Sequence, residues 1–224
     1  MKWLWSDIRS AHLTLAIACV LVVIEGCVSS LDFLRRREVY DTFGLNHDGL
    51  ADGRVWQLIS HGLIHAGWLH VSLNVVLLIT TGARVERISG KGTVGKVFAA
   101  GVLLGGLVFL IVPLANEGRT LVGSSGGVFS LLLWMTTVSP ESRMFPIAVS
   151  ARNLGLGLLI ASGLLAVVGA FLTLGAAPVS HACHFGGGIA GVILGRRSLG
   201  RQVKLHDLQK ERARREIADG PRGQ

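Results

Sequence analysis

Six apolar stretches follow one another along this chain of 224 residues, and charged segments separate most of them. A helix that crosses the hydrocarbon core of a bilayer needs about 20 mostly apolar residues. The sequence therefore predicts an all-α membrane protein with six membrane-spanning helices. The stretches run over about 12–31, 56–83, 97–115, 125–138, 154–177 and 179–194. The fourth and sixth are short, which is tolerated where a helix is buried in a bundle with its ends in a water-filled cavity.

The composition supports this class of protein. Half of the residues are hydrophobic and 16% are charged, against about 25% charged in a soluble domain. These values exclude disorder, a coiled coil and an ordinary soluble enzyme. The 30 glycines suit helices that pack closely through small residues, and three cysteines are too few for a disulfide framework.

The positive charge has a topological pattern. Nine of the 22 Lys and Arg residues lie at or after Arg196, and the others flank the apolar stretches. This distribution is typical of orientation signals and of attraction to anionic lipid headgroups. Nucleic-acid binding would need a basic face on a folded soluble module, so we expect the lipid bilayer as a partner and no nucleic acid.

Six spans place both termini on one side of the membrane. With that side cytoplasmic, 17 basic residues lie inside and five outside, as the positive-inside rule requires. We therefore expect a cytoplasmic N-terminus (1–10), a six-helix membrane domain (11–197) and a basic cytoplasmic tail (198–224). The expected location is a cell membrane, as a multi-pass protein of the bacterial inner membrane.

The N-terminus has a second interpretation. Lys2 and Arg9 before an apolar run resemble a signal peptide, and Gly26-Cys27 loosely resembles a lipoprotein cleavage site. Glu25 stands where that site needs a small residue, and the run continues past Cys27. A first span is therefore favoured, with Glu25 near its outer end and in reach of headgroup water.

Polar residues inside the apolar stretches are the most informative feature, because a bilayer makes them costly. They form three groups: His61, His65, His70 and Asn74; Gly123-Ser124-Ser125-Gly126; and His181-Ala182-Cys183-His184. The spacings His61-x3-His65 and His181-x2-His184 are also ligand-like. No carboxylate in a span completes a metal site, so a metal is not expected.

Ser125 lies between a glycine-bearing turn and the apolar run 128–138. The N–H groups at a helix N-terminus lack intrahelical acceptors and can bind a developing oxyanion. A serine hydroxyl needs an adjacent base, and His184 is the candidate.

Glycines are expected to bring these two side chains together. Gly126 follows Ser125 directly, and Gly187, Gly191 and Gly195 repeat every four residues as a stripe on the sixth helix. Small residues let two helix backbones approach closely, so Ser125 and His184 are predicted to meet within hydrogen-bonding distance. No aspartate falls in spans two to six, and Glu86 lies at the cytoplasmic end of the second. The site is therefore predicted to be a dyad.

The second stretch offers donors to this dyad. His70 and Asn74 are four residues apart and share one helix face, and their expected target is the charge formed when Ser125 attacks a carbonyl. His61 and His65 are expected on a loop or in the first turn, near water.

Taken together, these motifs resemble those of the rhomboid intramembrane serine proteases, over about residues 55–197. The matching segments occur in the family's order: His61-x3-His65-x4-His70-x3-Asn74, Gly82-Ala83-Arg84-Val85-Glu86-Arg87, Gly123-Ser124-Ser125-Gly126 and His184-x2-Gly187-x3-Gly191. The resemblance implies a six-helix core with no cofactor, and membrane-anchored protein substrates cleaved in or near a transmembrane segment.

The resemblance also implies roles. Ser125 is the nucleophile, His184 is the general base, and His70 and Asn74 complete an oxyanion site with the Ser125 backbone N–H. Residues expected to support the site are His61, His65, Gly123, Gly126, Phe129, Gly187 and Gly191. The chain departs from the family in having Phe129 where a tyrosine stacks under the histidine, Gln57 where an arginine follows Trp56, and Cys183 where alanine is usual.

Two other functions remain open from the sequence. One is a catalytically silent rhomboid-like factor that binds membrane proteins. The other is a transporter in which the polar residues line a path. Both Ser125 and His184 are present, which favours the protease.

Overall fold

The computed structural model describes residues 8–112, 119–144, 149–171 and 181–218. Within these residues the regular structure is helical, apart from one antiparallel pair of two-residue strands. The helices are α2 (His12–Ser29), α3 (Phe33–Phe43), α4 (His47–Ala51), α5 (Gln57–Ser60), α6 (Trp68–Ser89), α7 (Lys91–Ile111), α8 (Ser125–Val138), α9 (Ala151–Phe171) and α10 (His181–Ala218), and the strands are β1 (Arg143–Met144) and β2 (Val149–Ser150). The predicted helical character is confirmed, and the strand pair was not predicted.

Among the described residues, four helices are long and apolar enough to cross a membrane, namely α2, α6, α7 and α9. The α8 helix is apolar but shorter. Large apolar side chains point outward from α2 and α9, such as Val23, Ile160 and Leu164, all more than half exposed. Outward apolar surface of this kind suits lipid contact, so the chain is an integral membrane protein. The count of six spans and the cytoplasmic placement of the termini stay predictions.

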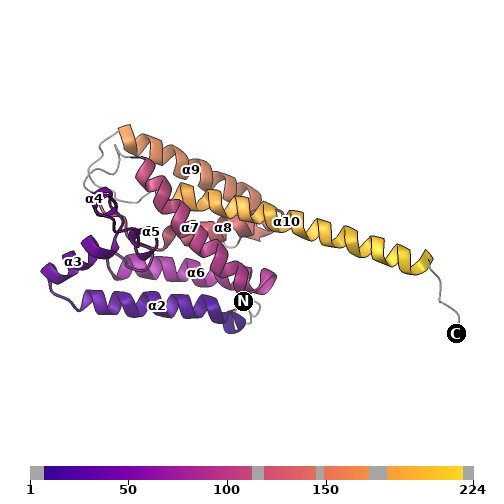
Figure 1. Cartoon of the computed structure of the whole chain (residues 1–224), viewed down its shortest axis with the longest axis horizontal. Helices are drawn as coiled ribbons and strands as arrows, with labels where there is room; N and C mark the ends of the chain where they lie inside the picture. The colour runs from indigo at the N-terminus through magenta and orange to yellow at the C-terminus, as the bar shows by residue number, and fades with distance from the viewer. Residues whose placement is uncertain (1–7, 113–118, 145–148, 172–180, 219–224) are drawn as a thin grey trace.

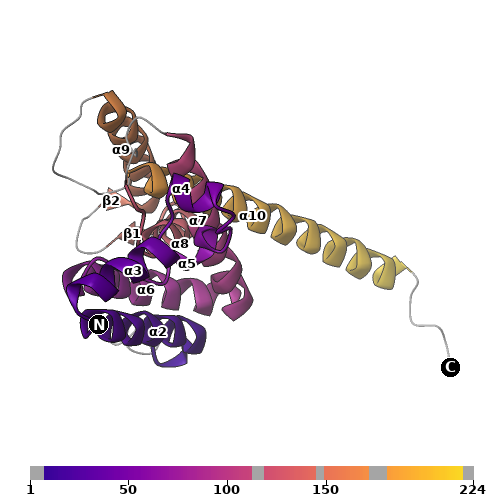
Figure 2. The same cartoon turned by 60° about the vertical axis from the view of Figure 1, so that its left-hand side comes forward.

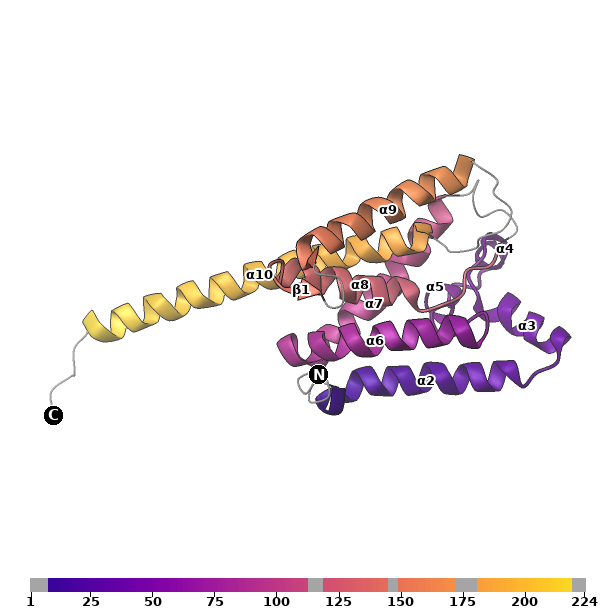
Figure 3. The same ribbon diagram turned by 180° about the vertical axis from the view of Figure 1, so that it is seen from behind.

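The helices surround α8. It packs against α6, α7, α9 and α10, and its most extensive contacts are with α10 and α7. The α2 helix lies beside α6 at one side of the bundle, and α9 lies beside α10 at the other (Figures 1 and 3). The short helices α3, α4 and α5 gather at one end of the bundle (Figure 2). Ser125, the first residue of α8, is half-buried at the end of this central helix.

Two apolar stretches fold differently from the prediction. The second does not form one helix, because α5 ends at Ser60 and α6 begins at Trp68 after Gly67, whose φ is 102°. The sixth continues far beyond 194 as α10, which runs to Ala218 and projects from the bundle (Figure 1). Its later residues are rich in Arg, Lys, Leu, Gln and Glu, which are good helix formers.

Glycines set the spacing between α8 and α10. A Cβ atom at Gly187 would press on the Gly126 carbonyl, and one at Gly191 would press on the Ser130 carbonyl. Hydrogen side chains at these positions let the two backbones touch, as small residues do in membrane helix pairs. The predicted glycine stripe therefore lies in this interface.

Glu86, near the C-terminal end of α6, binds the first turn of α2. Its carboxylate accepts hydrogen bonds from the Leu13 N–H (3.1 Å), the Thr14 N–H (2.9 Å) and the Thr14 hydroxyl (2.7 Å). The two N–H groups lie in the first turn of α2 and have no intrahelical acceptor. The side chain of the N-cap residue, Ala11, cannot accept a hydrogen bond from them. Glu86 thus caps α2 from a neighbouring helix.

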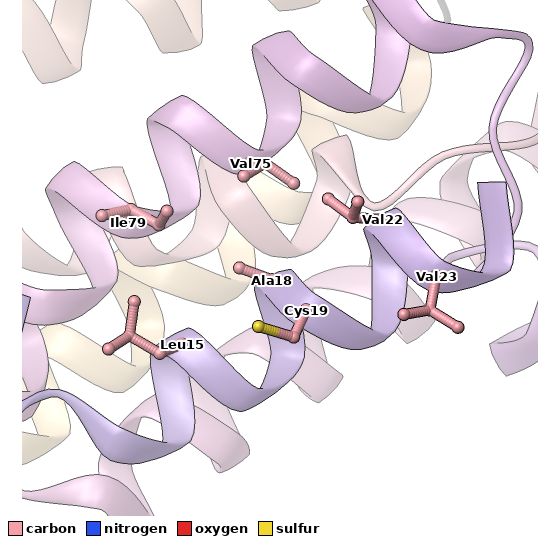
Figure 4. A pocket seen from close by; sticks show the side chains of 7 residues that line it. All are labelled: Leu15, Ala18, Cys19, Val22, Val23, Val75 and Ile79. Carbon is pink, nitrogen blue, oxygen red and sulfur yellow. The ribbon is translucent and has the colours of Figure 1, made fainter. Parts of the chain in front are cut away.

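A shallow groove of about 260 Å³ runs between α2 and α6 (Figure 4). Its lining is entirely apolar: Leu15, Ala18, Cys19, Val22, Val23, Val75 and Ile79. Such a surface suits hydrocarbon and offers no polar group for chemistry.

We predict that Gly187→Ala lowers stability by about 1–3 kcal/mol, because the added methyl group overpacks the α8–α10 contact. Thermal unfolding in detergent measures the effect. Gly157→Ala is the control, since a Cβ there meets nothing within 4 Å. Equal melting temperatures for the two variants would contradict the close contact.

Candidate active site

The turn before α8 needs a glycine. Gly123 has a φ of 116°, which L side chains rarely adopt. A Cβ atom at Gly123 would also lie 2.7 Å from His70 Cε1. Gly123 therefore lets the chain turn into α8 while the His70 ring rests against it.

The turn brings Ser125 to His184. The Ser125 Oγ lies 2.9 Å from His184 Nε2, a side-chain hydrogen bond between the first residue of α8 and the first turn of α10. The predicted contact is therefore present. No carboxylate hydrogen-bonds to His184 among the described residues, so the pair is a dyad in this part of the chain.

Two rings surround His184. The Phe129 ring stacks on it with centroids 4.2 Å apart and an interplanar angle of 6°. The His181 ring meets it edge-on at 6.2 Å. Stacking fixes the plane of the imidazole without a hydrogen bond, so the absence of a tyrosine hydroxyl at position 129 leaves the stacked geometry in place.

His61 and His65 hold the turn from behind. The Ser124 N–H donates to His65 Nε2 (3.2 Å), and the Ser124 Oγ lies 3.1 Å from the same nitrogen. The Gly123 N–H donates to the His61 carbonyl (2.8 Å), and His61 Nδ1 lies 2.8 Å from the Gln57 carbonyl. Both imidazoles lie on the loop between α5 and α6, as predicted, but both are fully buried. The prediction that they lie near water is therefore wrong, because they pack behind the turn.

Burial keeps these two imidazoles neutral. It lowers the pKa of His61 to about 4. Burial, with a smaller effect of His70, also lowers the pKa of His65 to about 4. Removing a cation from water without a counter-charge is costly, so both rings are uncharged at neutral pH. His65 Nε2 can then accept the Ser124 hydrogen bond.

His70 and Asn74 lie on the α6 face toward this turn. The Ala66 N–H donates to His70 Nδ1 (3.4 Å), which leaves Nε2 to carry the proton in the neutral ring. That nitrogen would lie 2.8 Å from a Cβ at Gly123, beside the residues that lead to Ser125. The Asn74 amide is buried and donates one hydrogen to the His70 carbonyl (2.9 Å), leaving its second hydrogen.

Several residues that support the site were not predicted from the sequence. The Tyr40 hydroxyl donates to the His65 carbonyl (3.0 Å). Leu45 and Leu121 pair as an antiparallel bridge with N–H···O distances of 3.0 and 2.8 Å. Neither contact has a local sequence signal, because the partners lie 25 and 76 positions apart.

Gln57 stands where the rhomboid resemblance implies an arginine, and it anchors this part of the chain. Its side chain is fully buried, and Nε2 donates to the carbonyls of Asp41 (3.0 Å) and Thr42 (3.3 Å). The Trp56 indole N–H also donates to the Thr42 carbonyl (2.9 Å). This departure from the family pattern therefore keeps the loop tied to the α3 end.

Comparison with known proteins bears on this geometry. The family model described as the Rhomboid domain matches residues 52–201, more than half of the chain. This chain belongs to the rhomboid family. The matched segment contains the α8 turn, the dyad, and the histidines of α6 and its preceding loop.

Individual relatives agree with the rhomboid assignment. Rhomboid-related protein 2 of Mus musculus is 36% identical over 145 residues, 62% of this chain and 47% of that protein. The putative rhomboid protease YdcA of Bacillus subtilis is 32% identical over 84 residues, 37% of this chain and 41% of that protein. Rhomboid protease GluP of the same bacterium is 27% identical over 119 residues, 52% of this chain and 22% of that protein. The matches span less than half of the length of each relative.

We predict that the melting temperature falls as the pH is lowered from 7 toward 4. The pKa values of His61 and His65 are about 4 when folded and about 6.5 when unfolded. The unfolded chain therefore binds more protons than the folded chain below pH 6.5. The free energy of unfolding falls as the pH is lowered through that window. Thermal unfolding across the pH range measures this decline.

The control for this prediction is His65→Gln, which removes one of the two titrating groups. Its melting temperature should be lower at pH 7 but should fall less steeply as the pH drops. A wild-type melting temperature that stays level between pH 7 and 5 would contradict the neutral, buried state of the two rings.

Proposed function

We propose that this rhomboid-family protein is an intramembrane serine endopeptidase that works through the Ser125–His184 dyad. The observation that carries the proposal is the 2.9 Å contact between Ser125 Oγ and His184 Nε2. A half-buried hydroxyl at a helix N-terminus beside a stacked imidazole is an arrangement suited to acyl transfer. The printed names of two relatives, YdcA and GluP, also describe rhomboid proteases.

The proposed reaction has two steps. His184 Nε2 accepts the Ser125 proton as Oγ attacks the scissile carbonyl, and the resulting imidazolium then gives that proton to the leaving amine. The acyl-enzyme remains on Ser125. Water attacks it with His184 again as the base, which releases the acid product and restores the hydroxyl.

Charge on the tetrahedral intermediate needs donors. The Ser125 backbone N–H lies at the start of α8, where intrahelical acceptors are absent. His70 Nε2 lies against Gly123, and Asn74 has one free amide hydrogen. These three donors are proposed to bind the oxyanion.

The proposed substrates are membrane-anchored proteins, cleaved in or near a transmembrane segment. We propose six spans with both termini in the cytoplasm, since α8 and the first part of α10 add to the four long apolar helices. Location in a bacterial inner membrane stays a prediction, because the relatives come from Mus musculus and Bacillus subtilis alike.

The main alternative is a catalytically silent rhomboid-like factor that binds membrane proteins. The family contains proteins named only as rhomboid-related or rhomboid-like. An intact hydrogen-bonded dyad favours catalysis over this alternative, since a binding role does not require Ser125 and His184 to touch. The transporter alternative has no observation in its favour.

We predict that Ser125→Ala and His184→Ala abolish cleavage of a transmembrane reporter by the protein in proteoliposomes, because each removes one half of the dyad. Gel analysis of the reporter measures the product. Ser130→Ala is the control, since Ser130 is a buried serine of the same helix. Full cleavage by Ser125→Ala would overturn the protease assignment.

We predict that His70→Ala lowers the cleavage rate by about 10²–10³ through loss of one oxyanion donor. Initial rates at saturating reporter concentration measure the effect, and Thr80→Val on the exposed face of the same helix is the control. A His70→Ala rate within threefold of the wild type would show that His70 does not bind the oxyanion.

A further inference from the structure

Hydrolysis of the proposed acyl-enzyme needs a water molecule beside His184, but three polar groups that the sequence places near water do not reach it. His61 and His65 are fully buried behind the turn before α8. Glu25 is 1% exposed because it lies on the face of α2 that packs into the bundle, and its Oε1 accepts a hydrogen bond from the Ser29 hydroxyl (2.8 Å). The prediction that Glu25 reaches headgroup water is therefore wrong.

Two polar side chains of α6 near the dyad have other tasks. His70 Nδ1 accepts a hydrogen bond from the Ala66 N–H (3.4 Å), and its Nε2 is a proposed oxyanion donor. The Asn74 amide is buried and donates to the His70 carbonyl (2.9 Å). Both side chains are therefore committed to the oxyanion side of the proposed reaction.

His181 lies in a different place, at the first residue of α10. It comes three residues before His184, so the two side chains share one face of the helix. Their ring centroids are 6.2 Å apart, with an interplanar angle of 83°. Both residues are half-buried, so neither ring is enclosed in the bundle as the rings of His61 and His65 are.

The separation of the two rings fits one water molecule. A direct N–H···N hydrogen bond between imidazoles brings their centroids to about 5 Å, and the distance from His181 to His184 is longer than this. A single water that hydrogen-bonds to both rings spans the difference. Phe129 covers one face of the His184 ring, with centroids 4.2 Å apart, so water has to approach the base from another side.

We propose that His181 is a further catalytic residue, which holds the water that hydrolyses the acyl-enzyme. This inference rests on the proposed function. The neutral His181 ring has one nitrogen with a lone pair, and one hydrogen of the water donates to it. The other hydrogen donates to His184 Nε2. A water held through both hydrogens turns its oxygen lone pairs toward the acyl carbon on Ser125.

The hydrolytic step forms one bond and breaks one. The water oxygen attacks the acyl carbon while one water proton passes to His184 Nε2. Collapse of the tetrahedral intermediate breaks the bond between the acyl carbon and Ser125 Oγ, and Oγ takes that proton back from His184. The second water hydrogen stays on the product acid, and His181 neither gains nor loses a proton.

The test measures how the acyl-enzyme divides between two nucleophiles. The protein cleaves a transmembrane reporter in proteoliposomes with hydroxylamine present, and mass spectrometry gives the ratio of hydroxamate to acid at the new C-terminus. His181→Phe keeps a ring beside His184 but has no nitrogen to hold water. Its ratio of hydroxamate to acid is expected to rise about tenfold, because only the attack by water depends on the held molecule.

Three comparisons accompany this variant. The rate at which a fluorophosphonate labels Ser125 reports the first step alone, and for His181→Phe it is expected within about twofold of the wild type. His181→Gln keeps a hydrogen-bond acceptor, and its product ratio is expected within about threefold of the wild type. His206→Phe is the matched control, since His206 is an exposed histidine farther along α10, and it is expected to change neither quantity.

Two outcomes overturn the role of His181 and leave the protease standing. One is a product ratio for His181→Phe that equals that of the wild type or of His181→Gln. The other is a loss of cleavage that is matched by a loss of Ser125 labelling, which would show that His181 only supports the fold of the site. A wild type that does not cleave the reporter contradicts both this inference and the proposed function.

Discussion

The backbone contact between α8 and α10 is the constraint on which the site depends. Ser125 begins one of these helices and His184 lies in the first turn of the other, so their hydrogen bond exists only while the helices touch. Gly187 and Gly191 allow that approach because neither has a side chain to hold the carbonyls of Gly126 and Ser130 away. Close packing through glycine replaces the hydrophobic effect, which does not drive association between helices in lipid.

A second constraint holds the nucleophile in place from outside the bundle's long helices. The neutral, buried His65 ring accepts a hydrogen bond from the Ser124 N–H, the His61 backbone carbonyl accepts one from the Gly123 N–H, and Tyr40 holds the His65 backbone. The loop in front of α6 is therefore part of the site. Neutrality is essential to this arrangement, since a protonated His65 Nε2 loses its ability to accept from Ser124.

The sequence predicted local features well and distant ones poorly. Ser125 at a helix start and the glycine stripe follow from residue type and spacing, which is why the Ser125–His184 contact was foreseen. The burial of Glu25 and of the two loop histidines was not, because it depends on how α3 and the α5–α6 loop fold over the bundle. The capping of α2 by Glu86 likewise joins residues 72 positions apart, and no local pattern reveals such a partner.

The most direct test of the account distinguishes two adjacent serines. The purified protein in membranes is treated with a fluorophosphonate, digested, and sequenced by mass spectrometry. A Ser125–His184 dyad predicts a single adduct on Ser125, lost in His184→Ala, with Ser124 unmodified because it is buried against His65. An adduct on Ser124, or labelling that persists without the His184 imidazole, would contradict the Ser125–His184 dyad.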